Sequence, residues 1–121
     1  MKVTTVNVVR DREDVGQLKD FLAVFGTDYV WTKSELWSAK KFRDNILPKA
    51  RLALNCVAGA SSTEIAKCLG EKDVHVTYGG MRLKPVIAST SSLIFKDVAY
   101  KRFWFSKWVA KYKGTSKLRY R

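Results

Sequence analysis

The chain has 121 residues, which is room for one domain, and 46% of them are hydrophobic, with six Phe, four Trp and five Tyr. This composition supports a globular core and excludes a disordered chain, and no apolar run approaches the roughly 20 residues that span a bilayer. Two cysteines without CxxC spacing and a single histidine exclude a zinc ribbon, a redox pair and a histidine-based metal site.

The net charge of +12 is concentrated at one end of the chain. Residues 98–121 hold eight of the 23 basic side chains and no acidic one, so the first 97 residues carry only +4. We therefore expect a folded body over residues 1–113 and a flexible basic tail over residues 114–121.

The chain opens with a strand and a helix. Residues 3–10 form a β-branched, nearly continuous apolar run, which is typical of a strand buried on both faces. An amphipathic helix capped by Asp11 or Asp14 follows. Gly26 stands where a helix-ending residue with positive φ belongs.

A second strand and helix follow the same plan. Residues 28–31 predict a short strand, and Thr32 and Glu35 form a capping-box pattern at the start of the next helix. That helix is expected to run to Leu47, because a proline comes next.

The middle of the chain predicts a third and a fourth strand. Residues 51–57 have the composition of a buried strand, and 74–78 form the next one. Between them, Ser61 and Glu64 form another capping-box pattern, and Gly70 is expected to close that helix.

Strand and helix alternate to the end of the chain, with a short helix over 93–95, a last strand over 98–105 and a final helix from Ser106. This order predicts an α/β fold, a Rossmann-like doubly wound parallel sheet with helices on both faces. The glycine-rich loop that holds pyrophosphate in this class has no counterpart here, nor has the strand before it. The predicted sheet is therefore incomplete.

Ligands of doubly wound sheets bind outside the carboxyl ends of the strands. The candidate residues are therefore Arg10, Asp11 and Arg12, residues 55–59, Tyr78, Gly79, Gly80 and Met81, and Phe103, Trp104 and Phe105. Arginines after a strand suit the 2′-phosphate of NADP, because guanidinium is always charged and binds phosphate with two donors. The alternative is a pair of solvated arginines at a helix start.

The glycines after residue 78 would let a ligand or another stretch of backbone approach closely, although a plain turn explains them equally well. His75, Cys56 and Cys68 are interpreted as packed structural residues, because they lie in expected strands or a helix. No catalytic grouping or metal-ligand cluster is evident.

Six motifs occur in order and at matching spacing in one known family. They are VNVVRDR at 6–12, RLALNCV at 51–57, SSTE at 61–64, VTYGGM at 76–81, SLIFKD at 92–97 and FWFSKW at 103–108. Together they resemble the mitochondrial enoyl-[acyl-carrier-protein] reductases, or trans-2-enoyl-CoA reductases, of the medium-chain dehydrogenase/reductase superfamily. The resemblance covers about residues 4–110 and only the central part of the cofactor-binding domain.

Members of this family reduce the 2,3 double bond of enoyl thioesters with NADPH in mitochondrial fatty acid synthesis. The resemblance implies that Arg10 and Arg12 bind the 2′-phosphate of NADPH and that Asp11 contributes to the same cofactor-binding loop. It further implies that residues 78–81 line the cofactor near its nicotinamide, and that residues 103–105 present backbone groups to the carboxamide.

Two positions depart from the family pattern. Phe105 stands where the family usually has leucine, and Ala58 where it usually has glycine. Neither change is expected to abolish cofactor binding.

The family's substrate domain, its catalytic tyrosine and its first Rossmann strand have no counterpart in the sequence. We therefore expect a cofactor-binding fragment that is inactive by itself and meets an enoyl thioester only in a complete enzyme. The absent strand is the central one in the order 3-2-1-4-5-6, so the strands at 3–10 and 51–57 would each lose a neighbour. We expect the chain to form homo-oligomers or to pair with another chain through these open sheet edges.

The basic end supports a different interpretation. It interleaves Trp104, Trp108, Tyr112 and Tyr120 with lysine and arginine, a composition that suits RNA or an anionic surface. On that interpretation the chain is a noncatalytic remnant that binds nucleic acid or a protein partner. We favour residues 103–108 as part of the core, so nucleic acid is not expected as a partner. A mitochondrial location is implied by the resemblance alone, because no targeting sequence is visible.

Overall fold

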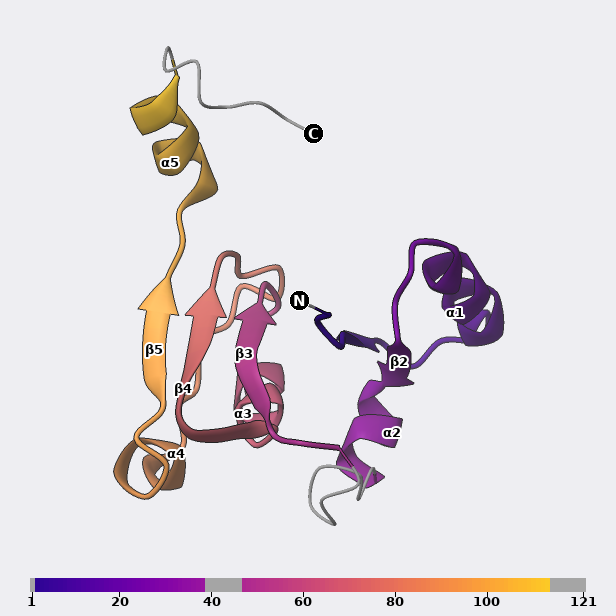
Figure 1. Ribbon diagram of the computed structural model, residues 1–121, viewed down its shortest axis with the longest axis horizontal. Coiled ribbons are helices and arrows are strands. Elements are labelled where there is room, and N and C mark those ends of the chain that lie inside the picture. The colour runs from indigo at the N-terminus through magenta and orange to yellow at the C-terminus, as the bar shows by residue number, and fades with distance from the viewer. Residues whose placement is uncertain (1, 39–46, 114–121) are drawn as a thin grey trace. The chain divides into compact units, whose positions relative to one another are not determined.

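A computed structural model describes residues 2–38 and 47–113, which form two compact units with their boundary between Pro48 and Lys49 (Figure 1). Each unit consists of parallel strands and connecting helices, which confirms the α/β class. The sheet orders are β1-β2 and β3-β4-β5. These are the two parts of the order 3-2-1-4-5-6 that remain when its central strand is left out.

The first unit contains β1 (Val6–Val9), α1 (Val15–Val24), β2 (Tyr29–Thr32) and α2 (Lys33–Ser38). Strand β1 pairs with β2 in parallel, and Val6 lies opposite Tyr29. Gly26 has a φ of 84° after α1, as its place in the sequence predicts. The continuation of α2 toward Leu47 falls largely on residues 39–46, outside the described residues.

The second unit contains β3 (Ala50–Asn55), α3 (Ala60–Ala66), β4 (Leu69–Thr77), α4 (Thr90–Ile94), β5 (Ala99–Arg102) and α5 (Phe105–Tyr112). All three strands are parallel, and their arrows point the same way in Figure 1. The last strand is shorter than the sequence predicts, because α5 begins within the expected 98–105 segment.

Two expectations about α3 are wrong. Ser61 does not cap the helix, because α3 begins one residue earlier and Glu64 instead pairs with Lys67 at 2.8 Å. Gly70 does not close the helix either, because α3 ends before it and Gly70 lies inside β4. A carboxylate of Asp73 accepts a hydrogen bond from the Gly70 amide at 2.9 Å, across an irregular stretch of the β3–β4 pairing.

The core of the second unit lies on one face of its sheet. Ala53, Leu69 and Val98 are buried together, and Ile65 of α3 and Tyr100 of β5 pack against them. On the other face of β3, Leu52 and Leu54 are 55% and 62% exposed. The expectation that helices cover both faces of the sheet is therefore not met at β3.

The final helix also departs from expectation. No residue of α5 is buried, and the side chains of Phe103, Trp104 and Phe105 are exposed. The assignment of residues 103–108 to the core is therefore wrong for this structure. No helix in the described parts of the chain is long and apolar enough to cross a membrane.

Candidate functional site

The arginines at the carboxyl end of β1 differ in their surroundings. Arg10 is exposed and has no hydrogen-bond or ion-pair partner among the described residues. Arg12 is paired with Asp14 through two bonds, one of which joins Nη2 to Oδ2 at 2.7 Å. This pair, above all its hydrogen bond, lowers the pKa of Asp14. Asp14 occupies the cap position of α1, but its carboxylate bonds Arg12 and makes no cap hydrogen bond.

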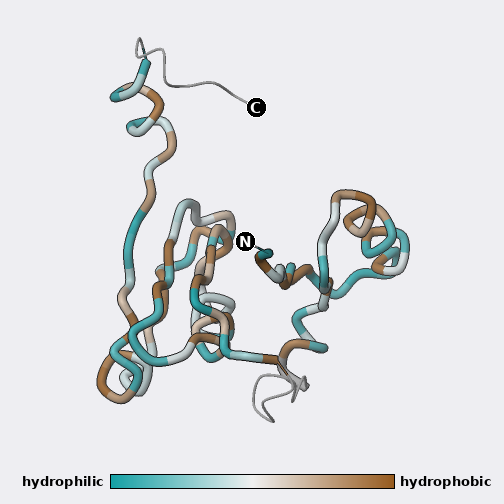
Figure 2. The backbone as a smooth tube through the Cα atoms, in the orientation of Figure 1, coloured by the Kyte–Doolittle hydropathy of each residue, from teal (hydrophilic) through white to brown (hydrophobic). Residues whose placement is uncertain are grey.

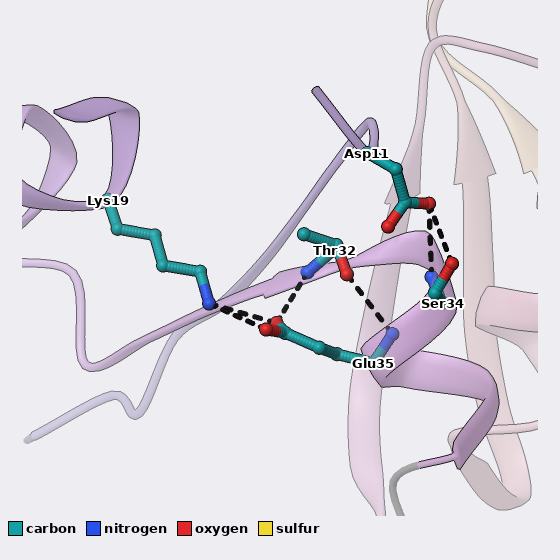
Figure 3. Close-up of polar contacts among 5 residues, drawn as sticks. All are labelled: Asp11, Lys19, Thr32, Ser34 and Glu35. Atoms are coloured by element: carbon teal, nitrogen blue, oxygen red, sulfur yellow. Dashed lines mark hydrogen bonds and ion pairs between the residues drawn. The ribbon is translucent and has the colours of Figure 1, made fainter. Parts of the chain in front are cut away.

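Asp11 is turned toward the next loop of the unit, not toward α1. Its Oδ2 atom accepts hydrogen bonds from the Ser34 hydroxyl at 2.9 Å and the Ser34 amide at 3.3 Å (Figure 3). The hydroxyl bond is the main reason that the pKa of Asp11 lies below its ordinary value. Asp11 therefore holds the start of α2, and the expectation that it might cap the helix directly after it is wrong.

The capping box predicted at the start of α2 is present. The Thr32 hydroxyl accepts from the Glu35 amide at 3.1 Å, and Glu35 Oε2 accepts from the Thr32 amide at 2.8 Å (Figure 3). Lys19 of α1 donates to both oxygens of Glu35, at 2.8 and 3.0 Å. The Lys19 hydrogen bond is the main cause that lowers the pKa of Glu35. These contacts fix the loops after β1 and β2 against each other, and they leave Arg10 as the cation that can take a ligand.

The carboxyl ends of β3, β4 and β5 meet at one edge of the second unit. The Tyr78 amide donates to the Asn55 carbonyl at 2.9 Å, and the Phe103 amide donates to the Thr77 carbonyl at 2.9 Å. These bonds continue the ladders beyond the strands, so the predicted residues after β4 and β5 lie side by side. Hydrogen bonding to the Cys56 thiol, with some burial, raises the pKa of the Tyr78 hydroxyl.

The turn after β4 is held against the loop after β3. The Met81 amide donates to the Cys56 carbonyl at 2.8 Å, and the Arg82 amide donates to the Val57 carbonyl at 3.1 Å. A Cβ atom on Gly79 would lie 3.4 Å from both the Cβ and the carbonyl oxygen of Cys56. These distances are ordinary van der Waals contacts and Gly80 has no neighbour within 4 Å, so the structure does not show the close approach that the glycine pair would allow.

The loop after β3 is shaped by Asn55. Its Oδ1 atom accepts from the amides of Val57 at 3.2 Å and Ala58 at 3.1 Å, and its Nδ2 atom donates to the Thr77 hydroxyl at 3.2 Å. Ala58 has a φ of 67°, in the left-handed region that favours glycine. The geometry thus explains why glycine is the usual residue there in the family that the sequence resembles.

Sequence reasoning missed two contributions to these strand ends. Ser34 binds Asp11 although 23 residues separate them, and no local pattern joins two positions across two strands. The Cys56–Tyr78 contact arises because β3 and β4 are neighbours, so it could be found only by combining the predicted topology with the strand ends.

The candidate residues thus form two groups, one in each unit. Arg10, Asp11 and Arg12 belong to the first unit, and residues 78–81 and 103–105 to the second. Chemically, the first group offers an unpaired guanidinium suited to phosphate, and the second offers aromatic side chains and backbone groups suited to a planar ring. Within the described residues, no group of three or more His, Cys, Asp or Glu side chains could hold a metal ion.

Comparisons with known proteins find chains similar to this one among the mitochondrial enoyl reductases. No family model matches it. The mitochondrial enoyl-[acyl-carrier-protein] reductase of Mus musculus is 50% identical over 111 residues, which cover 89% of this chain and 29% of that protein. The human enzyme of the same name is 49% identical over 107 residues, covering 86% of this chain and 28% of that protein.

Solved structures agree with the curated relatives. The Etr1p complex with NADP and crotonyl-CoA superimposes with a TM-score of 0.80 at 33% identity and covers 91% of this chain. The match extends over 32% of that structure's chain. The chain therefore spans less than a third of the length of the enzymes that it matches.

Proposed function

We propose that this chain supplies part of the NADPH-binding site of an enoyl thioester reductase. Over most of its length it resembles, in sequence and in fold, one segment of the mitochondrial enoyl-[acyl-carrier-protein] reductases. The observation that carries the proposal is the match in sequence and in backbone to one segment of these enzymes, the Etr1p complex with NADP and crotonyl-CoA among them. The corresponding reaction is reduction of the 2,3 double bond of an enoyl thioester in mitochondrial fatty acid synthesis.

The first unit binds the 2′-phosphate of NADPH. Arg10 is the primary ligand, because its guanidinium is exposed and unpaired among the described residues. Arg12 joins it by exchanging its bonds to Asp14 for bonds to phosphate. Asp11 contributes to the same loop by accepting hydrogen bonds from Ser34, which holds its carboxylate toward the start of α2.

The second unit binds the nicotinamide end of the same cofactor. Tyr78, Gly79, Gly80 and Met81 line the cofactor, and Phe103, Trp104 and Phe105 present backbone groups to the carboxamide. Support comes from the shared edge on which these residues lie, at the carboxyl ends of parallel strands, where ligands of this fold class bind. NADPH would supply the hydride, and these residues would bind and orient the ring.

The chain does not catalyse by itself. Hydride transfer needs the nicotinamide and the enoyl thioester held together, and the matched segment is under a third of each related enzyme. We propose that the chain acts in mitochondria, paired with a second copy or another chain through the edges of β1 and β3. A related solved structure, the Etr1p/Etr2p heterodimer of Candida tropicalis, is itself an assembly of two chains, with a TM-score of 0.77.

Calorimetric titration of the purified chain with NADPH and with NADH tests this proposal. We expect saturable binding that prefers NADPH, because only NADPH carries the 2′-phosphate. The variant Arg10→Ala/Arg12→Ala should weaken NADPH binding roughly 10- to 100-fold, the effect of losing charge-assisted hydrogen bonds. NADH binding should change little.

Arg51→Ala is the matched control. Its side chain is 94% exposed and lies 4.0 Å from Asp73 in the second unit, so it removes a cation without touching the proposed site. This variant should bind NADPH like the parent chain. Equal affinity for NADPH and NADH would contradict the assignment, and so would full NADPH affinity in the double variant. The assignment is also wrong if circular dichroism shows a folded chain and that chain does not bind NADPH.

A further inference from the structure

The final helix carries an aromatic stripe of which only the first residue, Phe105, belongs to the proposed cofactor site. We define the aromatic stripe of α5 as Phe105, Trp108, Val109 and Tyr112, which recur at the i, i+3, i+4 and i+7 positions of one helix face. Successive rings of the stripe touch, with centroids 6.4 Å apart for Phe105 and Trp108 and 5.1 Å apart for Trp108 and Tyr112. The stripe is therefore continuous along the helix.

The stripe is open to solvent. Phe105 is 58% exposed and Trp108 is 38% exposed, and no residue of α5 is buried. Phe103 extends the stripe beyond the helix, with its ring centroid 6.1 Å from that of Trp108. Large contiguous apolar surfaces of this kind mark sites of interaction with a protein or a membrane.

Basic side chains lie opposite the stripe and along its border. Lys107 lies about half a turn away from the stripe on an α-helix of 3.6 residues per turn, whereas the Lys111 ammonium lies 5.5 Å from the centroid of the Tyr112 ring. Lys101, Arg102 and Lys113 flank the helix, and the sequence from residue 98 onward contains no acidic residue. Both hydrophilic and hydrophobic residues occur along α5 in Figure 2.

We propose that α5 binds the surface of an anionic lipid bilayer, with its aromatic stripe inserted at the level of the headgroups and its lysines directed to the lipid phosphates. This inference is independent of the proposed cofactor function. An aromatic face combined with a lysine face is the composition of helices that lie in a membrane interface. Lys107 lies 5.8 Å from the Trp104 ring, so its ammonium already projects beside an aromatic group, as lysine does at an interface.

Charge decides between the candidate occupants of this face. A second copy of α5 would bring its own lysines and no acidic partner for them. Single-stranded nucleic acid could use the lysines that lie over Trp104 and Tyr112, but it offers no apolar interior to the rest of the stripe. An anionic bilayer satisfies both faces together, because its apolar interior takes the rings and its phosphates take the lysines.

Sedimentation with lipid vesicles at physiological ionic strength tests the proposal, using vesicles of phosphatidylcholine with about one third phosphatidylglycerol and vesicles of phosphatidylcholine alone. We expect the full chain to bind the anionic vesicles and to bind the neutral ones at least roughly tenfold more weakly. Trp108→Ser/Val109→Ser should weaken binding roughly 100-fold by removing apolar area. Lys107→Glu/Lys111→Glu should weaken it roughly 30-fold or more.

Two control variants match these changes. Phe95→Ser removes a ring that is 77% exposed on α4, and Lys2→Glu/Lys84→Glu makes the same change in net charge at exposed positions outside α5. Both should bind anionic vesicles like the parent chain. The proposal is overturned if the parent chain does not bind anionic vesicles, or if the α5 variants bind them as well as the control variants do. It is also overturned if the parent chain binds only RNA and the α5 variants lose that binding.

Discussion

Lys72 shows how the irregular start of β4 stores backbone strain. Its φ is 59°, in the left-handed region, and its amide donates to the Lys96 carbonyl at 2.7 Å. Its side chain is exposed. The strain is therefore not offset by packing of the side chain, and it remains only because the β4 bulge requires that conformation.

Lys72→Gly should stabilise the second unit by about 0.5–1 kcal/mol, because relief of about 1–2 kcal/mol of strain exceeds the added entropy of the unfolded chain. Urea unfolding at pH 7 measures the change. Lys101→Gly is the control, because Lys101 lies in β5 with no positive φ and its replacement should lower stability by about 1 kcal/mol. Equal losses in both variants would show that Lys72 is not strained.

His75 makes the second unit sensitive to mild acid. It is fully buried in β4, with its ring centroid 4.9 Å from that of Tyr100. Burial lowers the pKa of its imidazole below 6.5, and the backbone of Ser62 opposes this only in part. At a pH between the folded and the unfolded pKa of His75, the unfolded chain binds a proton that the folded chain does not. The stability of the fold therefore decreases as the pH drops below about 6.5.

We therefore expect the urea midpoint of the second unit to decrease from about pH 7 to about pH 5. His75→Phe keeps a ring beside Tyr100 and should remove this part of the pH dependence. His75 is the only histidine in the chain, so no other imidazole masks the effect. Identical pH profiles for the variant and the parent chain would refute this account.

At the scale of elements, α2 depends on the ionised form of Glu35. The Lys19 pair and the Thr32 amide both favour the carboxylate and lower the pKa of Glu35. A carboxylate with a lowered pKa stabilises the fold above its unfolded pKa, and that contribution disappears as the pH falls through the lower folded pKa. The capping of α2 should therefore be lost in acid below about pH 4.5.

Glu35→Gln should lower the stability of the first unit at pH 7, because a neutral amide cannot form the ion pair. The further loss of stability in acid should be smaller than in the parent chain, because the amide does not titrate. Chemical denaturation followed by far-ultraviolet circular dichroism between about pH 7 and pH 3 provides the comparison. Glu13→Gln removes an exposed carboxylate from the same unit and serves as the control. If both variants lose as much stability in acid as the parent chain does, Glu35 does not control α2.

The elements were predictable where local chemistry decides them. The capping box at Thr32, the positive φ of Gly26 and the parallel strands all follow from short patterns. The pattern at Ser61 failed because Ser62 is buried and donates to the Gly59 carbonyl at 2.6 Å, which shifts the helix start. The Ser62 hydroxyl also donates to the Ile87 carbonyl at 3.2 Å and accepts from the Ile87 amide at 3.0 Å, so contacts with a distant segment overrode the local pattern there.

The candidate site was predictable as a set of strand ends but not as a set of contacts. Parallel topology alone places residues 78 and 103 beside each other, and the structure bears this out. Among the described residues, Arg12 is paired and Arg10 is not. This difference depends on the side-chain geometry around Asp14, which no sequence pattern encodes. The cofactor roles of these residues remain predictions.

At the scale of the whole molecule, each sheet has an incompletely paired edge. Strand β1 pairs with β2 and strand β3 pairs with β4, and within the described residues no strand pairs with their other edges. Leu52 and Leu54 lie exposed on β3, so the open edge is accompanied by apolar surface. Such an edge accepts a strand from another chain.

We expect the chain to associate with itself as its concentration rises, which sedimentation velocity can detect. Leu52→Lys/Leu54→Lys should shift the distribution toward monomer, because lysines on an edge strand oppose pairing. Leu83→Lys/Ile94→Lys changes two similarly exposed residues outside the sheet and should leave the distribution unchanged. A parent chain that stays monomeric at every concentration would show that the β3 edge does not pair copies of this chain.

The turn after β4 also limits the kind of chemical group that it can recognise. The amides of Met81 and Arg82 already donate to the carbonyls of Cys56 and Val57, and the Leu83 amide donates to the Gly80 carbonyl. Among the described residues, the amides of Gly79 and Gly80 have no such acceptor, so they are the donors of this turn that a ligand can use. A ligand that meets this turn can therefore place an acceptor oxygen against the two glycine amides, whereas the amides that follow them are already engaged by the protein.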